Sequence, residues 1–128
     1  MKKIGVILVL AMLLTACHES LEDRCEREAK EYTAKKCPAK LDKNIRIDSL
    51  TFDRATHTLH YHYTLTDFAD QDGVMEKIGA IDLLKSELKN STSMATYKEN
   101  KYRFRYTYHS EKNPNKIWLD VTFTEKDY

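Results

Sequence analysis

Apolar and polar residues alternate one by one in two stretches of the chain, which predicts strands that bury one side and expose the other. Between residues 58 and 66 the apolar positions are Leu59, Tyr61, Tyr63 and Leu65. Between residues 102 and 108 they are Tyr102, Phe104, Tyr106 and Tyr108. A similar run at 45–52 precedes the first stretch, with a turn-forming segment at 53–57 between them. Another run at 117–123 follows the second stretch, after a turn-forming segment at 113–115. The pattern therefore predicts two hairpins.

A spacing of three or four residues between apolar positions marks two helices. Residues 19–36 carry a narrow stripe, and Pro38 ends that helix because the residue before a proline avoids helical geometry. Residues 74–90 carry a broader stripe, which predicts the main core helix. Its members are Val74, Ile78, Ile81, Leu84 and Leu88. A short extra turn is expected at 94–97.

The resulting order is helix, strand, strand, helix, strand, strand. Layer packing then predicts an α+β fold with two layers, in which a four-stranded antiparallel sheet carries both helices on one face. The opposite face would remain open to solvent. That face is the candidate binding surface, and it would display His60, His62, Arg103, Arg105, Trp118 and Asp120. An exposed tryptophan often marks a contact surface, whereas a merely solvated face is the simpler explanation.

Two histidines on one strand also raise the question of a metal. His60 and His62 would lie about 7 Å apart on one face. Zinc sites need at least three protein ligands, and the spacing offers no evident third one besides Asp120. We therefore expect no metal and no other cofactor.

The first residues have the form of an export signal. Lys2 and Lys3 precede an apolar run from Ile4 to Leu14, which as a helix is about 16 Å long, too short to span a bilayer. The sequence 14–17, Leu-Thr-Ala-Cys, resembles the lipobox of bacterial lipoproteins. That resemblance implies a signal peptide over 1–16, a lipidated Cys17 and a single domain over 17–128. His18 replaces the aspartate that retains enterobacterial lipoproteins in the inner membrane, which favours the outer membrane.

Two further cysteines follow in this exported domain, which suggests a disulfide between Cys25 and Cys37. A continuous helix between them would separate their Cα atoms by about 18 Å, far beyond disulfide distance. Either the helix is interrupted or both thiols stay free. Neither cysteine has the context of a catalytic nucleophile.

Composition narrows the function classes further. The 128 residues carry 21 basic and 20 acidic side chains, and this balance argues against a nucleic-acid-binding protein. Motifs of hydrolases, metalloproteases and phosphate-binding loops are absent. No catalytic residue is expected.

Four segments carry a diffuse family resemblance: residues 37–42, 47–50, 59–65 and 104–108, with their Pro-x-x-Leu-Asp and Tyr-x-Tyr patterns. From about Glu28 onward the chain resembles small exported α/β proteins of proteobacteria, some described as quorum-sensing-regulated, and short uncharacterised Bacteroidetes lipoproteins. The resemblance implies the two-helix, four-strand arrangement and carries over no catalytic residue.

These observations favour a non-enzymatic binding module, anchored to the membrane by its N-terminal lipid, whose partner is another envelope protein. Two alternatives stay open. One is a purely structural lipoprotein, and the other is a small metal-binding protein that uses His60 and His62.

Overall fold

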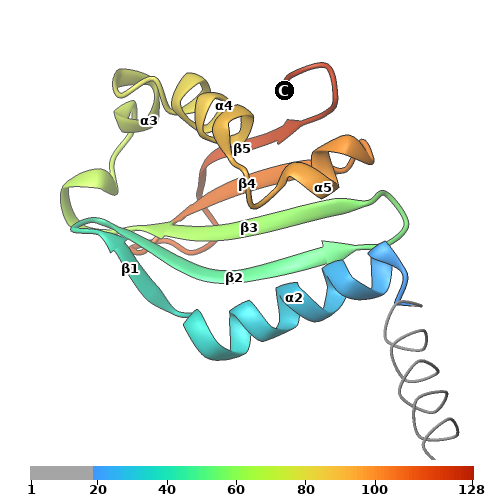
Figure 1. Cartoon of the computed structure of the whole chain (residues 1–128). Helices are drawn as coiled ribbons and strands as arrows, with labels where there is room; N and C mark the ends of the chain where they lie inside the picture. Colours follow the sequence, from blue (N-terminus) through green and yellow to red (C-terminus); the bar gives the residue numbers. More distant parts are fainter. Residues whose placement is uncertain (1–18) are drawn as a thin grey trace, which may run out of the picture.

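The computed structural model describes residues 19–128 (Figure 1). Its helices are α2 (Leu21–Lys36), η1 (Asp67–Ala69), α3 (Val74–Lys77), α4 (Ala80–Asn90) and α5 (Ala95–Glu99). Its strands are β1 (Ala39–Asp42), β2 (Ile45–Asp53), β3 (Thr58–Leu65), β4 (Arg103–Ser110) and β5 (Ile117–Phe123). Within this part of the chain, no helix is long and apolar enough to cross a membrane.

The five strands form one sheet in the order β1-β2-β3-β4-β5, and β3 and β4 run parallel. The predicted four-stranded antiparallel sheet is therefore wrong in strand number and in strand direction. The parallel pair arises because η1, α3, α4 and α5 all lie between β3 and β4. This helical connection brings the chain back to the end of the sheet where β3 began, so β4 enters beside β3 in the same direction.

Strand β1 is the strand that the periodicity did not predict. It has four residues, and only its first is partly buried. It pairs with the beginning of β2, where Ala39 lies opposite Ile47, and its register shifts between Lys40 and Asp42. A strand this short and this exposed shows no alternation of apolar and polar residues.

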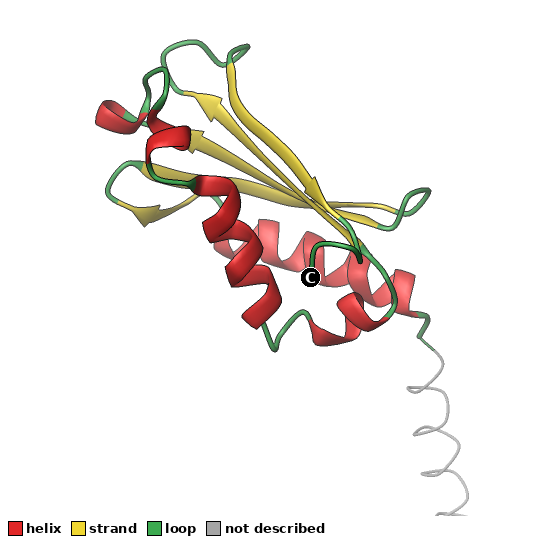
Figure 2. Ribbon diagram, turned by 90° about the horizontal axis from the view of Figure 1, so that it is seen from above, coloured by secondary structure: helices red, strands yellow, loops and turns green. Residues whose placement is uncertain are grey.

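Ser20 caps the N-terminus of helix α2, and its side chain accepts a hydrogen bond from the Asp23 N–H at 3.0 Å. Figure 2 shows α2, α4 and α5 on the same side of the sheet. Their buried residues complete the core from that side: Cys25 and Ala29 from α2, Ala80, Leu84 and Leu88 from α4, and Tyr97 from α5.

The predicted helix over 74–90 is broken in two. Gly79 has a φ of +64°, a left-handed conformation that glycine adopts without steric cost and that ends a helix. The break rotates α3 relative to α4, so the expected apolar stripe does not stay on one face. Ile78 and Ile81, predicted to be core residues, are 51% and 47% exposed.

Tyrosines stack across the parallel pair and hold its register. Tyr61 lies opposite Tyr106 and Tyr63 opposite Tyr108, with ring centroids 4.8 and 4.4 Å apart. Such aromatic pairs stabilise neighbouring strands beyond the area that they bury. The same alternation sends the intervening residues of β3 and β4 to the open face.

One threonine joins α2 to the sheet where β1 no longer covers β2. The Thr33 hydroxyl accepts a hydrogen bond from the Leu50 N–H at 2.9 Å and donates one to the Leu50 carbonyl at 2.8 Å. It thereby satisfies both backbone groups of one residue on β2.

Replacing Thr33 by valine, which keeps the shape, should lower the free energy of unfolding by about 1–3 kcal/mol because both groups lose their partner. Urea denaturation measures this loss. Thr33→Ser keeps the hydroxyl and should lose clearly less. Equal stability of wild type and Thr33→Val would contradict the stabilising role given to the Thr33 hydroxyl.

Candidate functional site

The sheet face away from the helices is open, and polar side chains of four neighbouring strands meet on it. The parallel register sets His60 opposite Arg105 and His62 opposite Thr107. The antiparallel pairing of β4 with β5 sets Arg105 opposite Thr122 and Thr107 opposite Asp120. Residues distant in sequence thus become one surface.

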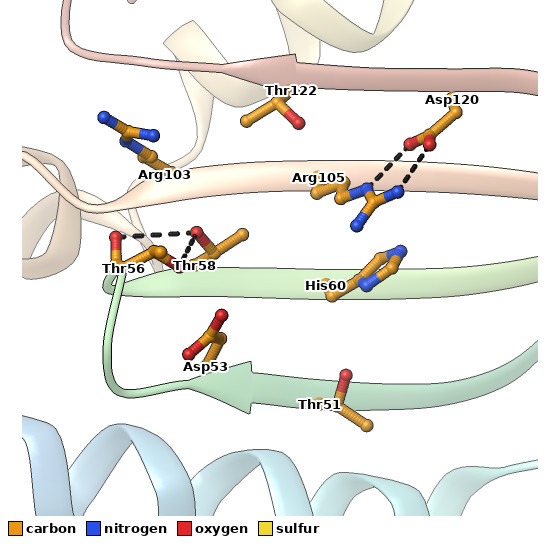
Figure 3. A pocket seen from close by; sticks show the side chains of 9 residues that line it. All are labelled: Thr51, Asp53, Thr56, Thr58, His60, Arg103, Arg105, Asp120 and Thr122. Atoms are coloured by element: carbon orange, nitrogen blue, oxygen red, sulfur yellow. Dashed lines mark hydrogen bonds and ion pairs between the residues drawn. The ribbon is translucent and has the colours of Figure 1, made fainter.

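A depression of about 390 Å³ lies on this face near the β2–β3 turn. Figure 3 shows side chains from β2, its turn, β3, β4 and β5 around it. It is lined by Thr51, Asp53, Thr56, Thr58, His60, Arg103, Arg105, Asp120 and Thr122. We call this depression the sheet-face pocket.

An ion pair forms one wall of the sheet-face pocket. Arg105 donates two hydrogen bonds to Asp120, with 2.8 Å between Nε and Oδ1 (Figure 3). The bonds from Arg105 lower the pKa of Asp120, and the same bonds raise the pKa of Arg105. The pair is therefore charged on both sides and fixed in a bidentate geometry.

The ion pair continues into a chain of hydrogen bonds. The Thr107 hydroxyl donates to Asp120 Oδ1 at 3.1 Å and lies 2.7 Å from Nε2 of His60. Because the single hydroxyl proton is given to Asp120, His60 Nε2 must carry a proton and donate to Thr107. This assigns the Nε2–H tautomer to His60.

Burial lowers the pKa of His60 to about 4, and the nearby His62 and Arg105 add to the shift. We expect an NMR titration of the imidazole to find a pKa well below 6.5. Between that value and 6.5 the unfolded chain binds a proton that the folded protein does not, so stability should rise with pH across this window. In His60→Gln the part of this pH-dependent increase in stability that comes from His60 should vanish. A pKa near 6.5 in the folded protein would contradict this environment.

His62 extends the cluster toward β2. Its Nε2 lies 3.1 Å from the Thr51 hydroxyl, and its ring centroid is 3.8 Å from that of His60. Among residues 19–128, no group of three or more histidine, cysteine or acidic side chains is arranged to hold a metal ion. The two imidazoles instead bond to hydroxyl groups of neighbouring strands.

Arg103 is the arginine of the pocket that remains available to bind an anionic group of a partner. It is exposed, and no carboxylate in the part of the chain that the structure describes forms an ion pair with it. Asp53, across the pocket, accepts a hydrogen bond from the Ala55 N–H at 3.0 Å. With two arginines, two aspartates and a neutral His60, the pocket presents both signs of charge and no net charge.

Trp118 lies outside the sheet-face pocket. Its indole N–H donates to Asp70 Oδ1 at 2.8 Å, and its ring packs partly against the core. Asp70 follows η1 and also accepts the Lys112 N–H at 3.0 Å. Of the six residues predicted for the open face, the structure brings His60, Arg103, Arg105 and Asp120 together at the pocket, sets His62 beside it and ties Trp118 to a loop.

Sequence reasoning did not single out the pocket residues on β2 and its turn, such as Thr51, Asp53 and Thr56. The register shift between Ile47 and Ser49 moves the polar residues of β2 onto the open face. The change of phase at Ser49 was the available signal, because a bulge reverses which residues face the helices.

The structure also places the two remaining cysteines. Helix α2 is uninterrupted, and both Cys25 and Cys37 are free thiols. Burial raises the pKa of Cys25 to about 12, so this thiol stays protonated and unreactive. The predicted lipidation at Cys17 and the signal peptide over 1–16 lie outside the described residues.

Solved structures share this fold. A secreted protein of Pseudomonas aeruginosa matches with a TM-score of 0.69 and 16% identity, over 84% of this chain and 96% of its own. The type II secretion system pilotin of Vibrio cholerae gives a TM-score of 0.63 at 11% identity, over 84% of this chain and 92% of its own. The type II secretion pilotin of Vibrio vulnificus gives 0.66 at 10% identity, over 84% and 90%.

The likeness to an exported proteobacterial protein agrees with one half of the sequence resemblance, and no Bacteroidetes lipoprotein family is confirmed. A search of curated protein sequences finds no significant match. A family model, in contrast, matches residues 20–119, which is most of the domain. The chain belongs to the family described as "Domain of unknown function (DUF8479)".

Proposed function

We propose that this protein is a non-enzymatic binding protein of the bacterial cell envelope, held to the membrane by a lipid on Cys17. Its open sheet face contacts another envelope protein. The observation that carries the proposal is the uncovered sheet face, where polar groups of both charges are held in place around the sheet-face pocket. A pocket of this kind suits a protein surface that offers both carboxylates and cations.

The chemistry of the pocket supports binding rather than catalysis. Thr107 is buried, and its hydroxyl accepts from His60 and donates to Asp120. In a catalytic triad the histidine accepts the proton of an accessible hydroxyl, and the carboxylate orients the histidine. Here the bonds run in the opposite sense, so the Thr107 hydroxyl is not activated.

The shared fold supports the same conclusion. Two of the similar structures are pilotins of type II secretion systems. We propose a comparable helper role for this chain, in which it assists another envelope protein without transforming a substrate. An outer-membrane position is part of the proposal.

A photo-crosslinking residue at position 103, in cells that express the full chain, tests the binding face. We expect one abundant envelope protein to be captured from this position and not from position 30, on the helical side, where Lys30 is 76% exposed. Adding Arg105→Ala should reduce capture, since it removes the ion pair beside the pocket. Identical products from positions 103 and 30, or none from either, would overturn the binding face.

The anchor needs a separate experiment. Cys17→Ala should leave the chain unprocessed or soluble and without acyl chains, as fractionation and mass spectrometry would reveal. Cys37→Ala is the matched control and should leave lipidation unchanged. An acylated Cys17→Ala protein would refute the anchor without affecting the binding face.

A further inference from the structure

A second surface lies at the far end of the molecule from the α2 N-terminus. Leu41, Ile78, Ile81 and Leu83 are between 47% and 55% exposed and surround the break between α3 and α4. We call these four residues the corner patch. Isolated exposed apolar residues are ordinary, but a cluster of large ones around a hollow marks a contact site.

Two depressions flank the corner patch and share the buried residues Met75 and Ala80. One, of about 230 Å³, lies between β1 and α4 and has Leu41, Ile78 and Leu83 in its walls and the stacked Tyr63 and Tyr108 among its lining residues. The other, of about 340 Å³, lies between Ile81 and Leu119 of β5. Together they make a mostly apolar surface that runs across the corner.

The charged side chains that line these depressions all have one sign. They are Glu76 and Asp82 in one and Glu87 in the other. None of the three forms an ion pair with another described residue, whereas all five acidic residues of α2 do. A partner that covers this surface must therefore supply apolar side chains together with lysine or arginine.

The corner patch lies at the end of the sheet opposite the start of α2. Arg54, in the β2–β3 turn, bonds to Asp23 and Glu26, which fixes the start of α2 at that end of the sheet. The patch lies near Ile45, at the other end of β2, about 26 Å away for nine strand residues. If Cys17 is the anchor, three residues separate it from α2, so the patch faces away from the membrane.

We propose that the corner patch binds an amphipathic helix of a partner protein, with apolar residues on one side and basic residues beside them. A helix fits because the depressions are formed by side chains, and the adjacent β1 edge offers only four residues to an added strand. This surface differs from the open sheet face, so the two proposals stand or fall separately.

The test uses the domain from residue 18 and an 18-residue Leu/Lys helical peptide, with a Leu/Glu peptide of the same pattern as control. Fluorescence anisotropy should find binding of the Leu/Lys peptide only, weakened by salt. Leu83→Ser with Ile78→Ser should reduce affinity at least tenfold. Glu76→Gln with Asp82→Asn and Glu87→Gln should reduce it severalfold.

Ile117→Ser is the matched control, because Ile117 is 48% exposed and lines neither depression. It should bind as the wild type does. Circular dichroism checks that each variant is folded. Equal binding of both peptides, unchanged binding by the Leu83→Ser, Ile78→Ser variant, or preference for an extended Val/Lys peptide would overturn the proposal. Dimers in sedimentation that dissociate in this variant would assign the patch to a second copy and overturn it too.

Discussion

Phe104→Ala is expected to lower the free energy of unfolding by about 3–5 kcal/mol, the range for truncating a fully buried phenylalanine. Phe104 is 0% exposed and pairs with Leu59 across the parallel strands. It also meets the ring of Tyr128 edge to face, with centroids 5.7 Å apart. Truncation would therefore leave a cavity where the β3–β4 pair meets the C-terminal segment.

The measurement is urea denaturation followed by tyrosine and tryptophan fluorescence. Phe104→Leu is the matched control, since it keeps most of the apolar volume and should lose less stability. Leu119→Ala, a change at a half-buried position of the neighbouring β5, should also cost less. A loss below 1 kcal/mol for Phe104→Ala would contradict the central position of this ring in the core.

The strands could be predicted because alternation depends on local sequence. Tyr61, Tyr63, Tyr106 and Tyr108 face the helices, as their phase indicated. Strand direction depends instead on where the connecting chain returns. Residues 66–102 were long enough for a crossover, but two hairpins also satisfied the same pattern, and only the packing of α4 and α5 decides between them.

The helix break could not be predicted from periodicity. Gly79 fits the spacing of a continuous helix at a cost of about 1 kcal/mol relative to alanine. In the structure it takes a left-handed conformation instead, because the turn lets Ala80 and Leu84 pack on the sheet. The apolar residues Ile78 and Ile81, which this turn leaves exposed, belong to the corner patch.

The residues of the open face could be predicted as far as the alternation of side chains along each strand determines them. His60, Arg105 and Asp120 alternate with core residues, and the register brings them into one network. Trp118 has the same phase as Asp120, yet it is tied to Asp70 across 48 residues of sequence. A contact between residues so far apart in the sequence depends on where η1 places the loop, and no local sequence pattern predicts it.

Asp70 should be the polar residue whose loss is most destabilising. It is 5% exposed, and burial disfavours its charged form. Hydrogen bonds from Ser110, the Lys112 N–H and Trp118 outweigh burial and lower the pKa of Asp70. The carboxylate thereby joins the loop after η1 to the β4–β5 turn and to the start of β5.

Asp70→Ala should lower the free energy of unfolding by about 3 kcal/mol at pH 7, because it leaves several donors around a buried position without an acceptor. Asp70→Asn keeps the shape but presents an amide N–H₂ to one of these donors, so about 2 kcal/mol should be lost. Because the folded pKa is lowered, the contribution of Asp70 is present above the unfolded value near 3.8 and disappears as the pH falls below it. The gap between wild type and Asp70→Asn should therefore narrow toward pH 3 in thermal unfolding. A gap that stays constant between pH 7 and pH 3 would mean that the charge of Asp70 does not stabilise the fold, and that shape alone holds Trp118 in place.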